Sequence, residues 1–520
     1  MNQFDSSNPP PGALIRWQRP PLARGKLFLS DAGGQRRAND PRSTNRLNRP
    51  NRLDAERQTD SRDPYRLAFS LLYLFTLLLY IRPNDLLPGL GSFPLAKIVA
   101  ILAPLAYIHA RYSLGKPIIN WTIEIQMVCT MLCLAILFTP VAASAADSVN
   151  TLSDSFIKMV IILILMIGVI NTRVRLRAII SLTVLCGTWL AIFAIKNYAT
   201  GNLTMKGDRI EGVVGGMFGN PNDLAAALCM LIPLAVTLAV MSAGSARLFH
   251  IACALVMTGG VIVTFSRGGF LTLIALAGVM MWKFGRGERE KIVLAAVIVF
   301  AALITATPEN YRSRFISIFD HSQDKTGSAQ QRSELFKHGV NLAIHNPIVG
   351  IGMGNFHIYS IREKVAHNAY VETAAELGLF GLIAYLVLIL APLRGLARIE
   401  REAKTANTPA DLDSRNLSIG LQAVIVAYMV ASFFLSIQYL WYLYYAAGYA
   451  AALRQIHAAE KSGEKSGEKF GEKFGEKSVW ANGRAAATAD QYQPIGKLWK
   501  SAPRKPAGNL WPAYRFRKGF

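Results

Sequence analysis

Residues 247–284 read RLFHIACALVMTGGVIVTFSRGGFLTLIALAGVMMWKF, and the architecture can be inferred from this segment. Two apolar runs are joined by a very short turn that carries a single arginine, Arg267. Each run is close to the length that crosses a hydrocarbon core, about 17–25 residues in a helix. Unbroken apolar runs of this length indicate membrane-spanning helices rather than the amphipathic helices of a soluble domain. The segment therefore predicts a transmembrane helical hairpin.

The same pattern recurs along the chain. Its 520 residues are 52% hydrophobic and only 17% charged, whereas soluble proteins average about 25% charged residues. The apolar runs lie at 67–81, 93–110, 122–144, 156–171, 177–198, 222–243, 247–265, 269–284, 291–307, 368–393, 415–437 and 438–454. The last run is rich in aromatic residues, so it is either an interfacial or a packed helix. We predict an all-α integral membrane protein with about 12 transmembrane helices.

The formal net charge of +23 would suggest nucleic-acid binding in a soluble protein, but its location argues otherwise. Residues 1–66 carry +6 and residues 454–520 carry +8. Loops after the even-numbered runs also carry clustered Lys and Arg, as at 173–177, whereas the intervening short loops carry few. Such a bias places the basic loops in the cytoplasm. We therefore expect both termini to be cytoplasmic, membrane lipids as neighbours and no nucleic-acid partner.

These observations divide the chain into five parts. We expect a disordered basic cytoplasmic tail, helices 1–9, one long outer loop between helices 9 and 10, helices 10–12, and a disordered cytoplasmic tail with GEKS and GEKF repeats. The boundaries are 1–66, 67–307, 308–367, 368–454 and 455–520. Within the long loop, Ser333–Ile344 has the pattern of an amphipathic helix, and a Gly-rich segment follows it.

The first candidate site is the segment from Arg209 to Asp223. A Gly-rich loop leads into Gly-Asn-Pro-Asn-Asp at the start of a helix. Asn220 is a suitable helix cap, Pro221 suits the first turn, and Asn222 follows it. The backbone N–H groups of such a helix start also favour an anion. For the Asn-Pro-Asn segment alone, a loop with a good helix cap is the favoured interpretation.

The second candidate site is the turn Thr264–Gly269, which carries Arg267. The arginine could extend to lipid headgroups. Alternatively, its five N–H donors suit a phosphate or pyrophosphate at the mouth of the bundle. The residues alone leave both interpretations open.

The third candidate site lies where the long loop re-enters the membrane, at His367-Asn368-Ala369-Tyr370-Val371-Glu372. Asn368, Glu372 and Glu376 are spaced to share one helical face. His367 stands at the helix start, where we expect it to be exposed to the outer compartment. A histidine in this position is either a general base or a hydrogen-bonding cap.

Four features follow one another along the chain: Arg209 with its Gly-Asn-Pro-Asn segment, the Ser-Arg-Gly turn, the NPxxGxGxGNF segment of the long loop and the His-Asn-x-Tyr segment. Together and in this order they resemble the O-antigen ligase/O-antigen polymerase superfamily of bacterial envelope glycosyltransferases. The resemblance covers roughly 67–454 and is densest at 209–390. It implies a multi-pass protein of the bacterial inner membrane with a periplasmic active site. The implied reaction transfers a glycan from undecaprenyl pyrophosphate to an acceptor hydroxyl, with lipid A–core as the acceptor of a ligase. Neither a metal nor another cofactor is implied.

The resemblance also implies residue roles. Arg209 and Arg267 match the arginines that stabilise the leaving pyrophosphate, and His367 matches the histidine that activates the acceptor. Four residues are expected to bind substrate or support the site: Arg332, Asn368, Glu372 and Asn222. Of these, Arg332 would hold donor phosphate or acceptor, and Glu372 would orient His367 or line the cavity.

Other functions are compatible with parts of the pattern. A repeat-unit polymerase and a protein O-oligosaccharyltransferase would use the same donor with a different acceptor. A transporter or lipid flippase is the alternative from another class, but residues 67–284 show no repeat of 291–454. A non-catalytic scaffold would not need Arg and His at the points where the chain re-enters the membrane. We therefore expect an enzyme.

Overall fold

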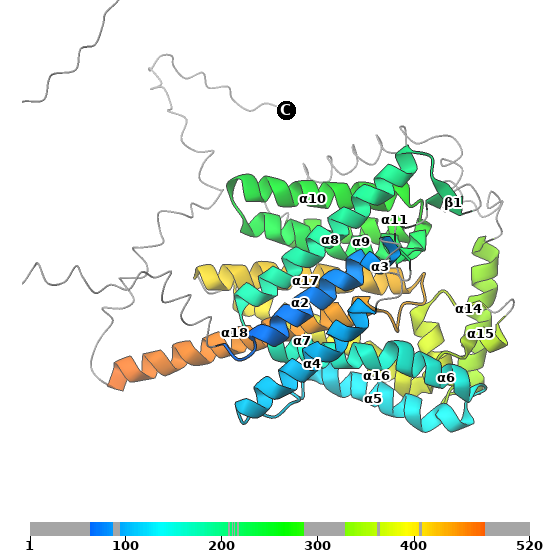
Figure 1. Ribbon diagram of the computed structural model, residues 1–520, viewed down its shortest axis with the longest axis horizontal. Coiled ribbons are helices and arrows are strands. Elements are labelled where there is room, and N and C mark those ends of the chain that lie inside the picture. The colour runs from blue at the N-terminus through cyan, green and yellow to red at the C-terminus, as the bar shows by residue number, and fades with distance from the viewer. Residues whose placement is uncertain are drawn as a thin grey trace, which may run out of the picture. The chain divides into compact units, whose positions relative to one another are not determined.

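The computed structural model describes residues 63–86, 94–205, 209–210, 212, 214–215, 218–284, 328–360, 364–404 and 408–473. These residues are mostly helical (Figure 1). The helices are α2 (Arg66–Ile81), α3 (Pro83–Leu86), α4 (Leu95–Ser113), α5 (Ile123–Phe138), η2 (Thr139–Val141), α6 (Ala145–Thr151), the π-helical η3 (Leu152–Phe156), α7 (Ile157–Val169), α8 (Arg173–Ala199), α9 (Pro221–Met241), α10 (Gly244–Val263), α11 (Arg267–Phe284), α14 (Ser328–His345), α15 (Phe356–Tyr359), α16 (Ala369–Glu402), α17 (Pro409–Ser432) and α18 (Trp441–Lys473). A short antiparallel pair, β1 (Leu203–Met205) and β2 (Arg209–Ile210), precedes α9.

Ten segments within the described residues are long and apolar enough to cross a membrane, and they correspond to ten of the twelve predicted runs. The predicted run 291–307 lies outside the described residues. The predicted run 438–454 falls in α18, whose first half is buried and whose second half is polar. The prediction of an all-α integral membrane protein is confirmed.

Local sequence explains where several helices begin. Side chains of Ser144, Thr172, Asn220, Asn368 and Thr408 accept hydrogen bonds from the first-turn N–H groups of α6, α8, α9, α16 and α17. These N–H groups have no partner inside the helix, so the caps satisfy them where water is scarce. Cap residues at the edges of apolar runs therefore set the helix starts.

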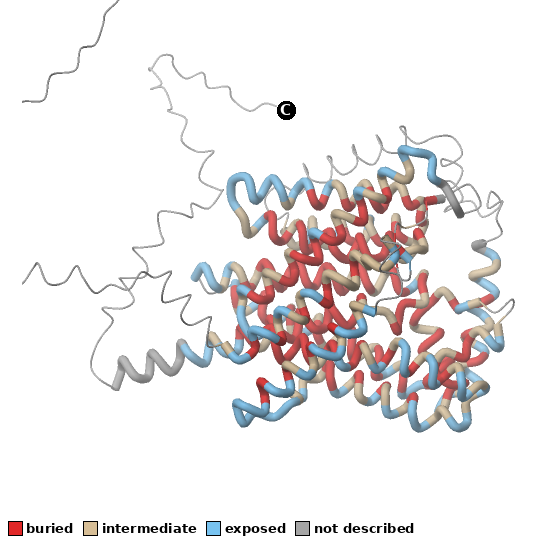
Figure 2. Tube along the Cα trace, viewed as in Figure 1, coloured by how far each residue is buried: buried red, intermediate tan, exposed pale blue. Residues whose placement is uncertain are grey.

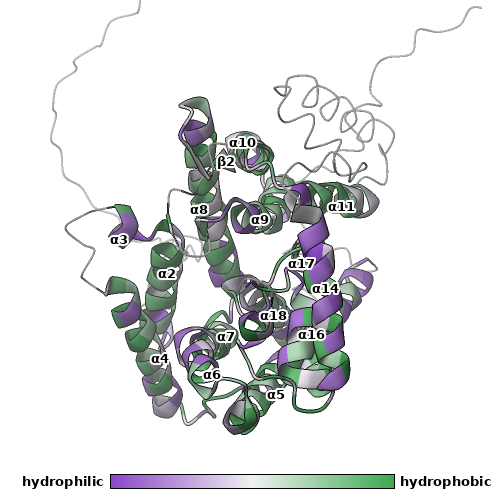
Figure 3. Ribbon diagram, turned by 90° about the vertical axis from the view of Figure 1, so that its right-hand side faces the viewer, coloured by the Kyte–Doolittle hydropathy of each residue, from purple (hydrophilic) through white to green (hydrophobic). Residues whose placement is uncertain are grey.

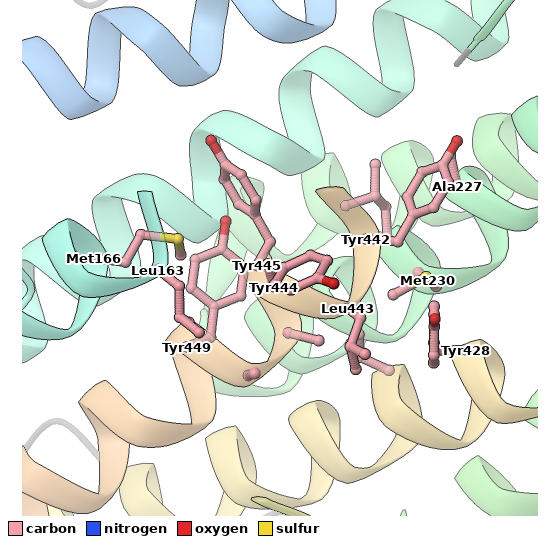
Figure 4. Packing of buried hydrophobic residues seen from close by; sticks show 14 of the residues in the cluster. Leu163, Met166, Ala227, Met230, Tyr428, Tyr442, Leu443, Tyr444, Tyr445 and Tyr449 are labelled. Atoms are coloured by element: carbon pink, nitrogen blue, oxygen red, sulfur yellow. The ribbon is translucent and has the colours of Figure 1, made fainter. Parts of the chain in front are cut away.

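Helix α18 lies in the centre of the bundle, which answers the open question about the aromatic run. Its tyrosines lie among side chains of α7, α9 and α17 (Figure 4), and the interior of the bundle is the most buried part of the structure (Figure 2). Tyr445 forms a hydrogen bond of 2.9 Å with Thr76 of α2, and Tyr444 donates one of 2.9 Å to the Gln438 carbonyl. Because their hydroxyls find partners, these rings can be buried as packed core residues.

The described helix extends further than we expected at its C-terminal end. Residues 455–473 continue α18, whereas we assigned them to a disordered tail. The physical reason lies in ion pairs that join this extension to other helices: Glu460 contacts Arg173 of α8, and Lys461 contacts Glu402 of α16. The rest of the tail, from 474 onward, lies outside the described residues.

Helix α14 lies across the ends of the bundle helices rather than along them (Figures 1 and 3). It contains the predicted amphipathic helix at 333–344 and is more hydrophilic than the helices behind it. It covers the end of the bundle at which α9, α11, α16 and α18 begin, here called the Glu372 end. The opposite end, where α16 finishes, is called the Glu400 end.

The Gly-rich segment after α14 is built into a break in α16. Gly378 has φ 66° and ψ −170°, a backbone conformation that is essentially restricted to glycine. At this break the Leu379 N–H donates to the Pro347 carbonyl, at 2.7 Å. The Ile351 and Gly352 N–H groups in turn donate to the carbonyls of Ala375 and Glu376, at 2.9 and 3.0 Å. The loop thus supplies part of the hydrogen bonding that α16 loses at the break.

Candidate functional site

The first two predicted sites meet at the Glu372 end. The Ser266 hydroxyl donates a hydrogen bond of 2.9 Å to the Asn222 side-chain oxygen. Ser266 also accepts one of 3.1 Å from the Gly269 N–H, so it caps α11. Asn220 caps α9 by accepting from the Asn222 N–H, at 2.9 Å. The Asn-Pro-Asn segment is therefore both a helix cap and one wall of a site.

Close packing fixes the turn that carries Arg267. Phe265 adopts a left-handed conformation with φ 51°, which turns the chain sharply into α11. A Cβ atom on Gly269 would lie 2.6 Å from the Cβ of Ala225, so only glycine permits this approach of α11 to α9. Arg267 is the first residue of α11 and is partly buried. The turn therefore holds Arg267 at the start of two closely packed helices.

A small cavity connects this turn to α14. Its lining includes Asn222, Ser266, Gly268, Arg332 and Phe434. The cavity measures about 10 Å³, which is room for roughly one water molecule. The structure thus brings the predicted residues Asn222 and Arg332 together beside the turn that precedes Arg267. At this volume the cavity is far too small for a sugar.

His367 is adjacent to the same region. Burial, together with the positive charges of Arg332 and Lys364, lowers its pKa from the usual 6.5 to about 4. The imidazole is therefore neutral at pH 7 and able to accept a proton. It is partly buried, not exposed as we expected.

The helix cap at this position is Asn368 rather than His367. Its side-chain oxygen accepts from the Tyr370 and Val371 N–H groups, at 3.1 and 3.0 Å. Its side-chain nitrogen donates to the Phe433 carbonyl, at 3.1 Å. Because Asn368 satisfies the helix start, the imidazole of His367 is not needed as a cap.

Glu372 is buried, and its carboxylate is held by the Ala366 backbone and by two side chains of the 433–440 segment rather than by the imidazole of His367. One carboxylate oxygen accepts from the Ala366 N–H, at 2.8 Å, and from the Ser436 hydroxyl. The other accepts from the Gln438 side chain, at 2.9 Å. Glu372 thus fixes the residue that precedes His367.

Glu376, one turn further along α16, binds the backbone at the end of the Gly-rich loop. Its carboxylate accepts from the Phe356 N–H, at 3.2 Å. The neighbouring Asn355 donates to the Ser148 hydroxyl and accepts from the Ser144 N–H, both at 2.7 Å. The third predicted site and the NPxxGxGxGNF segment are therefore one packed unit, supported from the side by α6.

The connection 433–440 between α17 and α18 is the part of the site that sequence reasoning missed. It supplies Ser436 and Gln438 to Glu372, the Phe433 carbonyl to Asn368, and Phe434 to the cavity. The only indication of it in the sequence was a pair of polar residues, Ser436 and Gln438, among apolar ones. That signal is weak, because nothing in it points to a partner more than 60 residues earlier in the chain.

For Arg209, the remaining predicted site residue, the structure describes the backbone only. Arg209 lies on β2, where its Cα pairs with that of Met205, and its side chain is outside the described part of the structure. After β2, the Gly212 N–H donates to the Gly219 carbonyl at 3.0 Å. The structure therefore does not place the Arg209 guanidinium relative to Arg267.

Comparison with known proteins agrees with this picture. Residues 252–386 match a protein-family model described as O-antigen ligase. The match includes Arg267, Arg332, His367 and Glu372, and excludes Asn222 and the 433–440 connection. A search of curated proteins found no match. The resemblance to the O-antigen ligase superfamily is confirmed over the matched residues.

Proposed function

We propose that this multi-pass membrane protein, in which an O-antigen ligase family match covers Arg267 to Glu372, transfers a glycan from undecaprenyl pyrophosphate to an acceptor hydroxyl. The match supports a membrane glycosyltransferase of the O-antigen ligase or polymerase type in general. The lipid-linked donor, a lipid A–core acceptor and a periplasmic site in the inner membrane are the specific parts of the proposal.

The observation that carries the proposal is the convergence of Asn222, Ser266 and Arg332 on one cavity, with Arg332 also acting on His367. These residues come from α9, the turn before α11, α14 and the start of α16. A structural cap at each helix would not require their side chains to converge. Convergence of a guanidinium and a neutral imidazole suits a reaction that needs an anion stabiliser and a base.

The chemistry assigns each group a role. The acceptor oxygen forms a bond to the anomeric carbon while the bond from that carbon to the pyrophosphate oxygen breaks. His367, neutral at pH 7, takes the acceptor proton. Negative charge develops on the leaving pyrophosphate, where Arg267, Arg332 and Arg209 stabilise it most effectively if they are held in place before reaction.

The charge of Arg332 acts on His367 both before and after the donor binds. Its guanidinium disfavours the imidazolium form of His367, which keeps the base unprotonated in the absence of substrate. When the acceptor proton reaches His367, the donor's anionic pyrophosphate offsets the positive charge of Arg332. The bound donor thus makes the imidazole more basic at the time it is needed.

A deletion strain tests the proposal. Loss of the lipopolysaccharide ladder, with long glycan accumulating on the lipid carrier, would support a ligase. Core carrying a single repeat would instead identify a polymerase, and an unchanged ladder would direct the search to glycoproteins or transport. Complementation with Arg267→Ala or His367→Ala should not restore the ladder, because each change removes roughly 10²-fold or more of rate. Complementation with Lys337→Ala, an exposed position of α14, should restore it.

A further inference from the structure

We infer that Gln438 and Ser436, in the connection between α17 and α18, are positioning residues that hold the backbone around His367 in its reactive conformation through Glu372. This inference deepens the proposed function and rests on it. It assigns a role to a segment that the family match does not cover.

The first step concerns the backbone of His367 itself. His367 has φ 53°, in the left-handed region that residues other than glycine seldom occupy. Such a conformation persists only where the surroundings enforce it. The residues on both sides of His367 must therefore be held.

The contacts on the two sides come from the same connection. Before His367, the Ala366 N–H donates to Glu372, which is held by the Ser436 hydroxyl and the Gln438 amide. After His367, the Asn368 side chain donates to the Phe433 carbonyl. The connection thus holds Asn368, after His367, by a direct bond. It holds Ala366, before His367, through the carboxylate of Glu372.

The connection is itself anchored in the core. The Tyr444 hydroxyl donates to the Gln438 carbonyl at 2.9 Å, and the Tyr428 hydroxyl lies 3.4 Å from the Ile437 carbonyl. Gln438 is only 1% exposed. A buried side chain with an anchored backbone and a carboxylate partner can transmit position to His367.

The chain provides a matched control at the other end of α16. There, the Gln422 amide donates to buried Glu400 at 3.1 Å, the same kind of bond as that from Gln438 to Glu372. Gln422, on α17, is 5% exposed, and its partner Glu400 lies 28 residues after Glu372 on α16. Gln422→Met and Gln438→Met therefore each remove a glutamine-to-glutamate hydrogen bond by the same change of side chain. Gln422→Met also removes the contacts of Gln422 with Lys283 and the Ser418 carbonyl, so the control loses at least as many hydrogen bonds.

The experiment measures glycan transfer by the purified full-length protein in liposomes, using an undecaprenyl-pyrophosphate-linked glycan and a hydroxyl acceptor. We expect Gln438→Met to lower kcat at least tenfold, with KM for the donor within twofold of the wild type. We also expect the acid limb of the pH–rate profile to rise from about 4 toward 6.5, because a displaced imidazole regains water and moves away from Arg332 and Lys364. Gln422→Met should lower only the thermal midpoint.

A second pair of variants, at Ser436, distinguishes a loss of positioning from misfolding. Ser436→Ala removes one oxygen and should shift the profile in the same direction, whereas Ser436→Thr keeps the hydroxyl and should restore it. An unchanged kcat and acid limb in both Gln438→Met and Ser436→Ala would overturn the inference. Equal effects of Gln438→Met and Gln422→Met on the profile would also overturn it. If the wild type shows no transfer above the His367→Ala background, the proposed function fails instead.

Discussion

The two ends of α16 hold buried carboxylates in different ways. Glu372 and Glu400 are 5% and 4% exposed, and each accepts an amide hydrogen bond from a glutamine. At Glu400 the further partners are the ammonium groups of Lys283 and Lys404, at 2.5 and 3.7 Å. At Glu372 they are a hydroxyl and a backbone N–H. Cations at the Glu400 end join helices, whereas neutral donors at the Glu372 end shape the backbone beside a base.

The difference extends beyond α16. Ion pairs near the Glu400 end link Arg454 of α18 to Glu124 of α5, and Arg177 of α8 to Asp413 of α17. Asp413 belongs to an Asp-Leu-Asp segment at the start of α17. We therefore expect substitutions at the Glu400 end to change stability and those at the Glu372 end to change transfer. Four predictions test this contrast.

The largest loss of stability should follow Arg454→Ala. Arg454 contacts both oxygens of Glu124 at 2.5 and 2.6 Å, and the Glu124 side chain is 0% exposed. Its removal leaves a buried charge without its cation, which costs roughly 3–5 kcal/mol of unfolding free energy. Chemical unfolding in micelles measures this, with Arg398→Ala, an exposed position, as the control. A change below about 1 kcal/mol, or transfer lost per folded molecule, would contradict the contrast.

Gly378→Ala should disturb the Glu372 end with a smaller loss of stability. Its φ of 66° is unfavourable for alanine, and the new Cβ would lie 2.5 Å from the Ile348 carbonyl oxygen. The strain is worth roughly 1–3 kcal/mol, and relief of it displaces the loop from α16. Unfolding and transfer should therefore both suffer. Gly278→Ala, where a Cβ meets nothing within 4 Å, is the control and should behave as the wild type.

Arg332→Gln should change the pH dependence of transfer rather than stability. Arg332 lowers the pKa of His367 by repelling the imidazolium, so its loss raises that pKa from about 4. Protonation then removes the base at a higher pH, and the acid limb moves upward. The shift should stop short of 6.5, because burial is the larger cause and persists. The pH–rate profile measures the shift, and an acid limb that stays in place would show that Arg332 does not act on the base.

Lys461→Ala should have the smallest effect. Lys461 pairs with Glu402 at the Glu400 end, but its side chain is 45% exposed. An exposed ion pair contributes roughly 0–1 kcal/mol. The same unfolding assay should therefore show little change beside that of Arg454→Ala. A loss comparable to that of Arg454→Ala would mean that the number of ion pairs, rather than their burial, determines the stability of this end.

Much of the architecture could be predicted from residue order. Apolar run length locates membrane helices because a bilayer has a fixed thickness, and ten predicted runs match the described spans. Helix starts were also readable, since Asn220 caps α9 through a local bond to Asn222. The turn at Arg267 and the helix start at His367 could be singled out because polar residues at the ends of apolar runs are conspicuous. Each of these signals is contained within a few consecutive residues.

Tertiary structure alone decided how the candidate site is assembled. The bonds from Gln438 to Glu372 and from Asn355 to Ser148 join segments 66 and 207 residues apart. Neither helical periodicity nor hydrophobicity specifies such a partner, because both describe only one face of one helix. The lowered pKa of His367 likewise depends on Arg332, which acts on it from α14. Residue order therefore determined which side chains stand at the helix ends, and packing between distant helices determined which of them meet.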